Sequence, residues 1–273
     1  MRFVLLVAVA AIVCGQATAQ GTPATLPAAS VIARWPAEEA RQGVAADARF
    51  FFPNGNNTIG KYDKKTGRRV ARWQGPRARF PHMNSCVVDR AELVCAASNY
   101  PAVPMASAVE VFDTATLRHK RSIALPPQPG SLTWIERRGT EWYGAFANYP
   151  EGRGGEPGRD HRWTRLVRFD ARFRATGSWL FPLSVLDRFA PMSSSGGSWG
   201  EDGLLYVTGH DRGELYVLRL PPAGTVLDHV ATIALSTGGQ AIAWDRSQPR
   251  VLWSLDRATK MVVASRVPPV IMP

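Results

Sequence analysis

Five segments of this chain repeat one pattern, in which a small or polar residue leads a short apolar strand into an acidic turn. The five openings are residues 42–47, 84–89, 131–136, 197–202 and 240–245. After each opening come a second apolar strand, a loop, a third strand and a further turn. Repeats of about 40–50 residues that contain four short strands are typical of β-propeller blades. The sequence therefore predicts an all-β fold, a five-bladed β-propeller.

The last repeat lacks a strand of its own. Residues 251–254 and 261–264 supply its second and third strands, and no fourth strand follows. Residues 31–35 stand before the first repeat and resemble the outer strand at residues 70–73. We predict that this N-terminal strand completes the last blade beside residues 261–264. Such pairing closes the ring and removes an open sheet edge.

The first 19 residues predict a signal peptide. Arg2 supplies a positive charge, residues 3–13 form a short apolar core, and residues 17–19 (Ala-Thr-Ala) fit a cleavage site. No stretch reaches the roughly 18 apolar residues that a membrane helix needs. Cys14 raises the alternative of a lipoprotein, but the residue before it is not small. We therefore expect an exported protein, periplasmic or secreted, without membrane insertion.

Two cysteines remain in residues 20–273, which we expect to form a single domain. Cys86 and Cys95 lie on the first two strands of the second repeat. If Val88 pairs with Leu93, Cys86 lies opposite Cys95, at a Cα separation of about 4.5–5.5 Å that a disulfide can bridge. Because an exported protein meets oxidising conditions, we predict this disulfide. A buried pair of free thiols is the alternative.

The chain is basic, with 33 Lys and Arg against 22 Asp and Glu and a net charge of +11. A basic balance can indicate a nucleic-acid partner. Here the basic residues are scattered through turns and strand edges, without a run of five or more. We interpret them as a solvated surface. We expect a monomer that binds a small-molecule or peptide ligand and no nucleic acid.

Polar residues of distant loops converge in this fold. The loop leading into each inner strand and the loop between the second and third strands lie on one face of a propeller. These loops supply Arg41, Gln42, His82, Asn84, Ser131, Gln240, Asn56, Asn57, Asn99, Tyr100, Asn148, Tyr149, His210, Asp211, Asp256 and Arg257. The insertion at residues 151–163 adds Glu156, Asp160 and His161, and we expect it to fold over the mouth as a lid.

From this set we predict one site at the channel mouth. Its ligand-binding candidates are Gln42, His82, Asn84, Asn99, Tyr100, Asn148, Tyr149, Asp211 and Gln240. Its catalytic candidates are His161, His210, Glu156 and Asp160, groups that can act as general acids or bases. No cofactor is indicated by a motif, but His82, His161 and His210 with Asp160 or Asp211 offer ligands for a divalent metal.

Several of these residues have a structural alternative. Gln42, Asn84 and Gln240 lie on or beside inner strands, where polar groups tie neighbouring backbones next to a water-filled channel. Residues 99–101 and 148–150 both read Asn-Tyr-Pro at equivalent positions of adjacent repeats. They form either a stacking and hydrogen-bonding wall or turns inherited by blade duplication.

Two local segments resemble the plant-type glutaminyl cyclase (glutamine cyclotransferase) family of five-bladed propellers, many of them exported by bacteria. These are residues 42–44 (Gln-Gly-Val) and residues 204–209 (Leu-Leu-Tyr-Val-Thr-Gly) with 215–217. The resemblance implies a glutaminyl-cyclotransferase-like activity or a related hydrolase or cyclase activity. That family places its catalytic acid in a Gly-Glu-Gly segment leading into an inner strand, where this chain has no Glu. Glu156 or Asp160 would then have to serve. The alternative is a non-catalytic protein- or glycan-binding propeller.

Overall fold

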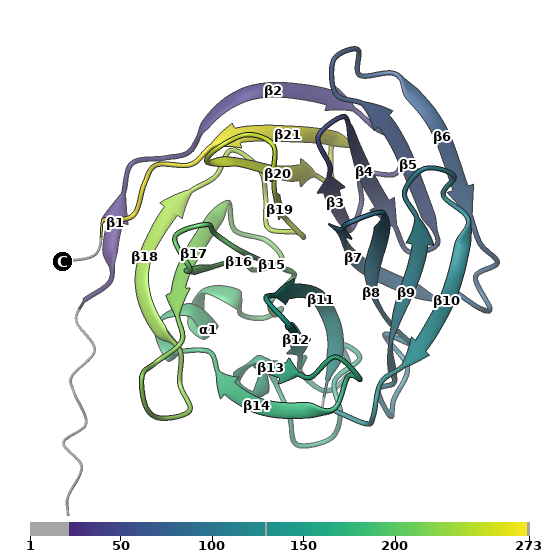
Figure 1. Cartoon of the computed structure of the whole chain (residues 1–273). Coiled ribbons are helices and arrows are strands. Elements are labelled where there is room, and N and C mark those ends of the chain that lie inside the picture. The colour runs from purple at the N-terminus through teal and green to yellow at the C-terminus, as the bar shows by residue number, and fades with distance from the viewer. Residues whose placement is uncertain (1–21, 129, 272–273) are drawn as a thin grey trace, which may run out of the picture.

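Five sheets surround a common axis in the computed structural model (Figure 1). The structure describes residues 22–128 and 130–271, so the signal peptide expected over residues 1–19 and Cys14 lie outside the described residues. Within those described ranges, no helix combines the length and the apolar character of a membrane span. The predicted all-β, five-bladed propeller is confirmed.

Each blade is built on consecutive antiparallel strands, of which the first is innermost. Blade 1 contains β3 (Gly43–Ala46), β4 (Phe50–Gly55), β5 (Thr58–Asp63) and β6 (Arg69–Gln74). Blade 2 contains β7 (His82–Asp89), β8 (Glu92–Ser98), β9 (Ser107–Asp113) and β10 (His119–Ala124). Blade 3 contains β11 (Ser131–Arg138), β12 (Glu141–Ala147), β13 (Arg165–Phe169) and β14 (Ala175–Leu180).

The last two blades each take a strand from the N-terminal segment. Blade 4 contains β15 (Gly196–Trp199), β16 (Leu205–Thr208), β17 (Glu214–Arg219), β18 (Asp228–Ala234) and β1 (Ala24–Leu26). Blade 5 contains β19 (Ala243–Trp244), β20 (Val251–Asp256), β21 (Met261–Arg266) and β2 (Ser30–Pro36).

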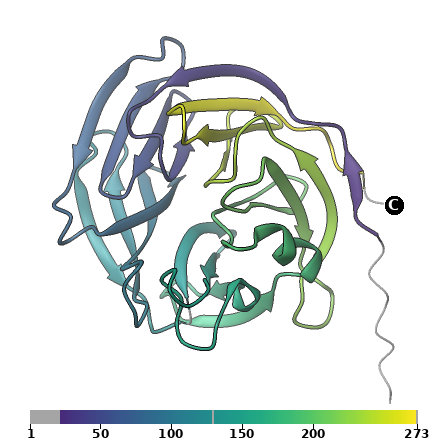
Figure 2. The same cartoon turned by 180° about the vertical axis from the view of Figure 1, so that it is seen from behind.

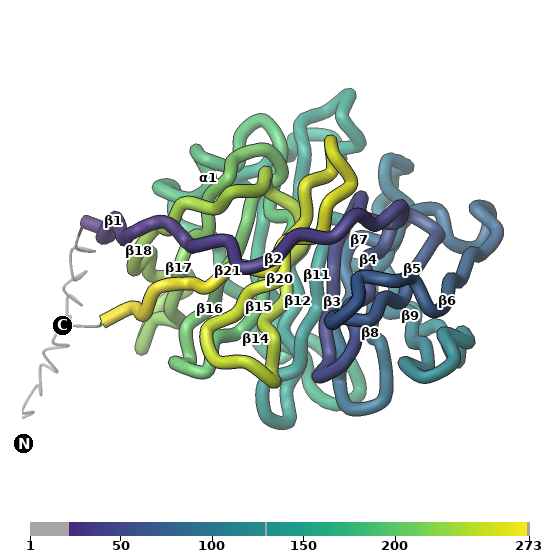
Figure 3. Tube along the Cα trace, turned by 90° about the horizontal axis from the view of Figure 1, so that it is seen from above, coloured from purple at the N-terminus to yellow at the C-terminus, as the bar shows by residue number. Residues whose placement is uncertain are grey.

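The N-terminal segment closes the ring as predicted and adds one contact that the sequence did not indicate. Strand β2 pairs antiparallel with β21, with Trp35 opposite Val262. Strand β1 pairs in parallel with the outer strand β18. Figures 1 and 3 show β1 and β2 running along the outside of the molecule from blade 4 to blade 5. This segment therefore joins two blades at the point where the ring closes.

Aromatic residues of the inner strands fill the spaces between blades. Trp134 of blade 3 and Trp199 of blade 4 belong to one buried cluster. Trp244 of blade 5 meets the ring of Tyr206 of blade 4 edge-on, at 4.9 Å between centroids. A Cβ atom on Gly197 would lie 2.3 Å from the Trp134 ring, so only glycine admits this indole. Packing against Trp134 thus explains why a small residue opens the fourth repeat.

The predicted disulfide is confirmed. Val88 lies opposite Leu93 and Cys86 opposite Cys95 in the register of β7 and β8. The two sulfur atoms are 2.05 Å apart, and the Cα atoms are 4.0 Å apart. The bond therefore joins the two innermost strands of blade 2 across the turn between them.

Two insertions thicken one face of blades 3 and 4. Helix α1 (Leu183–Phe189) buries Val185, Leu186 and Phe189, which share one apolar helix face, against the cluster between these blades. The 3-10 helix η1 (His161–Trp163) ends the insertion that separates β12 from β13. Figure 2 looks onto this face, with α1 on the near side. The site described next opens on the same face.

Candidate functional site

The loops leading into the inner strands and the loops between second and third strands meet at one end of the channel. A cavity of about 330 Å³ lies there, within the size range of small-molecule sites. All five blades, or the links into them, contribute to its lining. The lining residues are Gln42, His82, Asn84, Tyr100, Thr133, Tyr149, Arg153, Met192, Ser195, His210, Gln240 and Arg257.

One wall of this cavity is a row of rings. The His82 and Tyr100 rings are 5.1 Å apart between centroids, and the Tyr100 and Tyr149 rings are 4.9 Å apart. Met192 packs against the same cluster, and the Tyr100 hydroxyl donates to the Arg153 carbonyl at 3.1 Å. The two Asn-Tyr-Pro loops thus supply the tyrosines of a continuous wall. Such a surface suits a planar or apolar group of a ligand.

Side-chain amides line the cavity in fixed orientations. The Asn84 Nδ2 group donates to the Leu132 carbonyl at 2.7 Å, which ties blade 2 to blade 3. The Gln42 Nε2 group donates to Asn56 Oδ1 at 2.7 Å. The Gln240 Nε2 group donates to the His210 carbonyl at 3.3 Å. The structural role considered for these residues is therefore present, and the same residues also line the cavity.

His82 is a neutral imidazole at physiological pH. Burial lowers its pKa to about 4, and the nearby Arg257 charge acts in the same direction. A hydrogen bond with Asn84 opposes this effect but is the smaller contribution. Because Asn84 engages one ring nitrogen, the neutral ring offers its other nitrogen to a ligand. As a proton acceptor it is weak, because its conjugate acid is strong.

His210 is held between two charged neighbours. Its Nδ1 atom is 2.5 Å from Asp211 Oδ1, and its Nε2 atom is 3.2 Å from an Arg257 Nη atom. Because a guanidinium only donates, Nε2 accepts and Nδ1 carries the proton that faces Asp211. Both ring nitrogens are thus engaged, and His210 positions Arg257 at the edge of the cavity.

Three predicted ligand-binding residues lie outside this cavity. Asn99 braces its own loop, where Nδ2 donates to the Pro104 carbonyl at 3.0 Å and Oδ1 accepts from the Ala106 amide at 2.8 Å. Asn148 is buried, and its Nδ2 group donates to the Trp163 carbonyl at 3.2 Å. Asp211 lines a neighbouring cavity with Arg257.

The insertion at residues 151–163 is tied to blade 2 and supplies only Arg153 to the lining. Glu156 Oε1 accepts from the Met105 amide at 3.2 Å. Asp160 caps η1, and its hydrogen bonds with Arg162 lower the pKa of the carboxyl. Nδ1 of His161 is buried and lacks a hydrogen-bond partner among the described residues. Glu156 and Asp160 therefore stabilise the conformation of the insertion and do not line the mouth cavity.

The residues considered as metal ligands are not brought together in the described part of the chain. Across residues 22–128 and 130–271, no three His, Cys, Asp or Glu side chains lie close enough together to hold a metal ion. His161 belongs to η1, and His210 faces Asp211 and Arg257. His82, His161 and His210 thus do not form one ligand set with Asp160 or Asp211.

Sequence reasoning missed four lining residues of the mouth cavity, namely Thr133, Arg153, Met192 and Ser195, and also Arg77, which lines a second cavity beside it. Arg153 and Arg77 escaped because scattered arginines were interpreted as solvated surface. Thr133 was recoverable, since it lies on the inner strand β11, one residue before the buried Trp134. Two arginines and no Asp or Glu line the mouth cavity in the described part of the chain. The site therefore has a positive charge.

The fold is similar to solved β-propellers, whereas the sequences differ. The PQQ-bound form of aldose sugar dehydrogenase from Streptomyces coelicolor matches with a TM-score of 0.54 and 11% identity, over 88% of this chain and 98% of that chain. The luciferin-regenerating enzyme matches with a TM-score of 0.50 and 11% identity, over 89% of this chain and 95% of that chain.

A third structure is more distant. The β-propeller domain of Cps50 (Swd1) from Myceliophteria thermophila has a TM-score of 0.44 and 10% identity, over 83% of this chain and 82% of that chain. No family model matches the sequence, and no curated protein matches it. At such identities the similarity shows the β-propeller fold alone.

Proposed function

We propose that this protein is an exported propeller that binds a small molecule or a peptide end at the channel mouth. The observation that carries the proposal is the lining, in which groups from all five blades surround one cavity of about 330 Å³. Its aromatic row suits a planar group, and Arg153 and Arg257 suit a carboxylate or another anionic end. The ligand class is therefore a small aromatic acid or a peptide end.

Binding without catalysis is better supported than a cyclotransferase reaction. His82 is a weak base, His210 is engaged at both ring nitrogens, and Glu156 and Asp160 lie outside the cavity. Ring closure of an N-terminal glutamine needs a group that accepts the amine proton. The lining offers no strong acceptor among the described residues.

The test uses the dipeptide Gln-Phe and N-acetylphenylalanine as probes. Calorimetric titration measures binding, and ammonia release from Gln-Phe measures cyclotransferase activity. We expect binding of at least one probe without ammonia release. Tyr100→Ala should weaken it by about tenfold, whereas Tyr100→Phe, which keeps the ring, should change it less than about threefold. Unchanged affinity in Tyr100→Ala would contradict the proposed site, and ammonia release would establish an enzyme.

The affinity should also be nearly constant from pH 8 to pH 5. Because the pKa of His82 is lowered to about 4, its charge changes only below that range. A transition centred near the ordinary histidine value of about 6.5 that persists in His210→Asn would show that His82 is not desolvated by this cavity. The pH series uses N-acetylphenylalanine, because the α-amino group of Gln-Phe itself changes charge near pH 8.

A further inference from the structure

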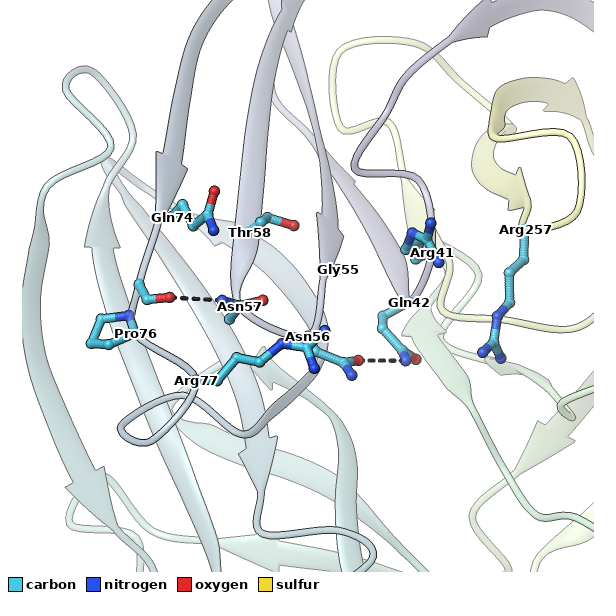
Figure 4. Close-up of a pocket in the computed structure, with 11 residues that line it drawn as sticks. Arg41, Gln42, Gly55, Asn56, Asn57, Thr58, Gln74, Pro76, Arg77 and Arg257 are labelled. Carbon is cyan, nitrogen blue, oxygen red and sulfur yellow. Dashed lines mark hydrogen bonds between the residues drawn. The ribbon is translucent and has the colours of Figure 1, made fainter.

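A second cavity lies beside the channel mouth, along the end of blade 1 and as far as Arg257 of blade 5. We call it the blade 1–5 cleft. Its volume is about 540 Å³, and Arg41, Arg77 and Arg257 are among its lining residues (Figure 4). Arg41 precedes β3, Arg77 follows β6, and Arg257 lies in the turn between β20 and β21. Three segments far apart in the sequence therefore bring one guanidinium each to the same cleft.

These arginines differ from the 13 arginines of the described chain that form ion pairs with carboxylates. Arg137, Arg219 and many more form ion pairs with carboxylates. No carboxylate partner of Arg41, Arg77 or Arg257 is present in the part of the chain that the structure describes, and no Asp or Glu lines the cleft there. Like charges that face one cavity repel one another and create a positive potential. An anion in the cleft would relieve that repulsion.

Neutral donors complete the cleft. The Gln42 Nε2 group donates to Asn56 Oδ1 at 2.7 Å, so the Asn56 amide nitrogen points away from Gln42. Figure 4 shows Arg77 extending toward Asn56 from one side, with Arg41 and Arg257 on the other side of the Gln42–Asn56 pair. Guanidinium groups match phosphate and carboxylate oxygens with paired N–H donors. The cleft thus presents the donors that an oxyanion requires.

We propose that the blade 1–5 cleft binds a small polyanion that carries at least two negative charges. The anionic groups of this ligand are either phosphoryl or polycarboxylate groups. Gln42 and Arg257 line both this cleft and the mouth cavity. The cleft therefore adds an anion subsite to the ligand at the mouth, a part of the inference that rests on the proposed function. Because the arginines are exposed, salt weakens this binding.

The experiment titrates the protein with pyrophosphate and, separately, with citrate at low ionic strength. We expect at least one anion to bind, with an affinity that falls as potassium chloride is added. Arg77→Gln should weaken it by about tenfold, the size of one lost charge-assisted contact. Arg77→Lys keeps the charge without the paired donors and should lie between. The matched control is Arg68→Gln, an exposed arginine in the turn between β5 and β6, at the opposite end of blade 1.

Each outcome decides a point. Binding of pyrophosphate alone identifies a phosphoryl ligand, citrate alone identifies a polycarboxylate, and both identify charge as the main determinant. Absence of binding to the wild type overturns the inference, and so does an equal loss in Arg68→Gln. Equal thermal unfolding midpoints establish that the variants are folded.

The test also separates this inference from the proposed function. Arg77 lines only the cleft, and Tyr100 lines only the mouth cavity. If Tyr100→Ala abolishes pyrophosphate or citrate binding and Arg77→Gln does not, the anion occupies the mouth and the cleft site is refuted. If Arg77 governs anion binding while both aromatic probes fail to bind, the cleft stands and the proposed function falls.

Discussion

Charged residues are used differently at the two ends of the channel. At the end away from the candidate site a cavity of about 340 Å³ also opens, but we call this end the closed rim because ion pairs link its blades. The acidic turn residue of four repeats is held there by a cation from another blade. The pairs are Asp89 with Arg137 at 2.7 Å, Glu136 with Arg246 at 2.7 Å, Asp202 with Arg250 at 2.8 Å and Asp245 with Lys64 at 2.6 Å. These pairs join blade 2 to 3, blade 3 to 5, blade 4 to 5 and blade 5 to 1.

At the other end, which we call the site rim, Arg159, Arg162 and Arg188 also pair with carboxylates, but four arginines that line cavities do not. Arg41, Arg77, Arg153 and Arg257 have no carboxylate partner among the described residues. The same repeat therefore provides both kinds of rim. Paired charges fix the blades relative to one another, whereas ligand binding needs donors that the protein leaves available. The comparison predicts that closed-rim substitutions reduce stability and that site-rim substitutions reduce binding.

The largest effect is expected at the pair of Asp245 and Lys64, whose side chains are 0% and 9% exposed. Asp245→Asn leaves a buried ammonium group without its counter-charge, which should lower the free energy of unfolding by about 3–5 kcal/mol. Urea denaturation measures this loss. Asp47→Asn is the matched control, since Asp47 caps only its own turn through the amides of Arg49 and Phe50, and it should cost about 1 kcal/mol. Equal losses of stability in Asp245→Asn and Asp47→Asn would show that the ion pair contributes no more than a local turn cap.

The same pair predicts a pH dependence. Burial alone would raise the pKa of Asp245, but hydrogen bonds from Lys64, Ser247 and Trp253 outweigh it and lower the pKa. The folded value lies below the unfolded one, so the stabilisation is complete above about pH 4 and is lost as the pH falls through the folded value. The stability difference between wild type and Asp245→Asn should therefore shrink from pH 7 to pH 3. A constant difference would argue against this ion pair.

The disulfide adds a covalent link near the closed rim. Replacing Cys86 and Cys95 together by Ala should lower the free energy of unfolding by about 2–3 kcal/mol, as expected for a loop of about ten residues. Urea denaturation of the double variant tests this value, and anion binding by the folded variant should be unchanged. Weakened binding would show that the two rims are coupled through blade 2.

A smaller effect is expected at Glu136, although it is also buried. Burial raises the pKa of Glu136 despite Arg246, so its charge is costly to maintain. Glu136→Gln removes that cost and keeps an acceptor for the Trp199 amide, which donates to the carboxylate at 2.7 Å. We expect a loss of about 1 kcal/mol in the free energy of unfolding. A loss as large as that of Asp245→Asn would mean that the charge itself is essential.

The smallest effect on stability is expected at the site rim. Arg77→Gln and Arg153→Gln should each change the free energy of unfolding by less than about 0.5 kcal/mol, because exposed side chains without partners contribute little. Chemical denaturation measures both variants. Destabilisation comparable to that of Asp245→Asn would show that the site rim is structural as well, and the comparison between the rims would fail.

Most of the fold could be predicted from local patterns. The repeated strand openings predict five blades, and the strand missing from the last repeat predicts the pairing of β2 with β21. Register alone placed Cys86 opposite Cys95. The parallel contact of β1 with β18 was not predictable, because three residues carry too little pattern to select a partner.

The candidate site was predictable only in its position. Strand direction requires the loops of Gln42, His82, Tyr100 and Gln240 to share one face, and these residues line the mouth cavity. Residue type then misled the choice within the insertion. Glu156 and Asp160 form hydrogen bonds near their own loop, while Arg153 reaches the cavity. The presence of an acidic or basic residue in the sequence does not show whether its side chain is already paired with another group.

The sequence by itself determined the blade repeat, the closing strand and the disulfide, because each depends on periodicity and register along short stretches of chain. Only the tertiary structure decided which charges are paired. Asp245 meets Lys64 across 181 residues of sequence, while Arg77 and Arg257 come to one cleft and meet no acid in the described chain. Ion pairs of this kind depend on distances between blades, and a local sequence pattern contains no information about those distances.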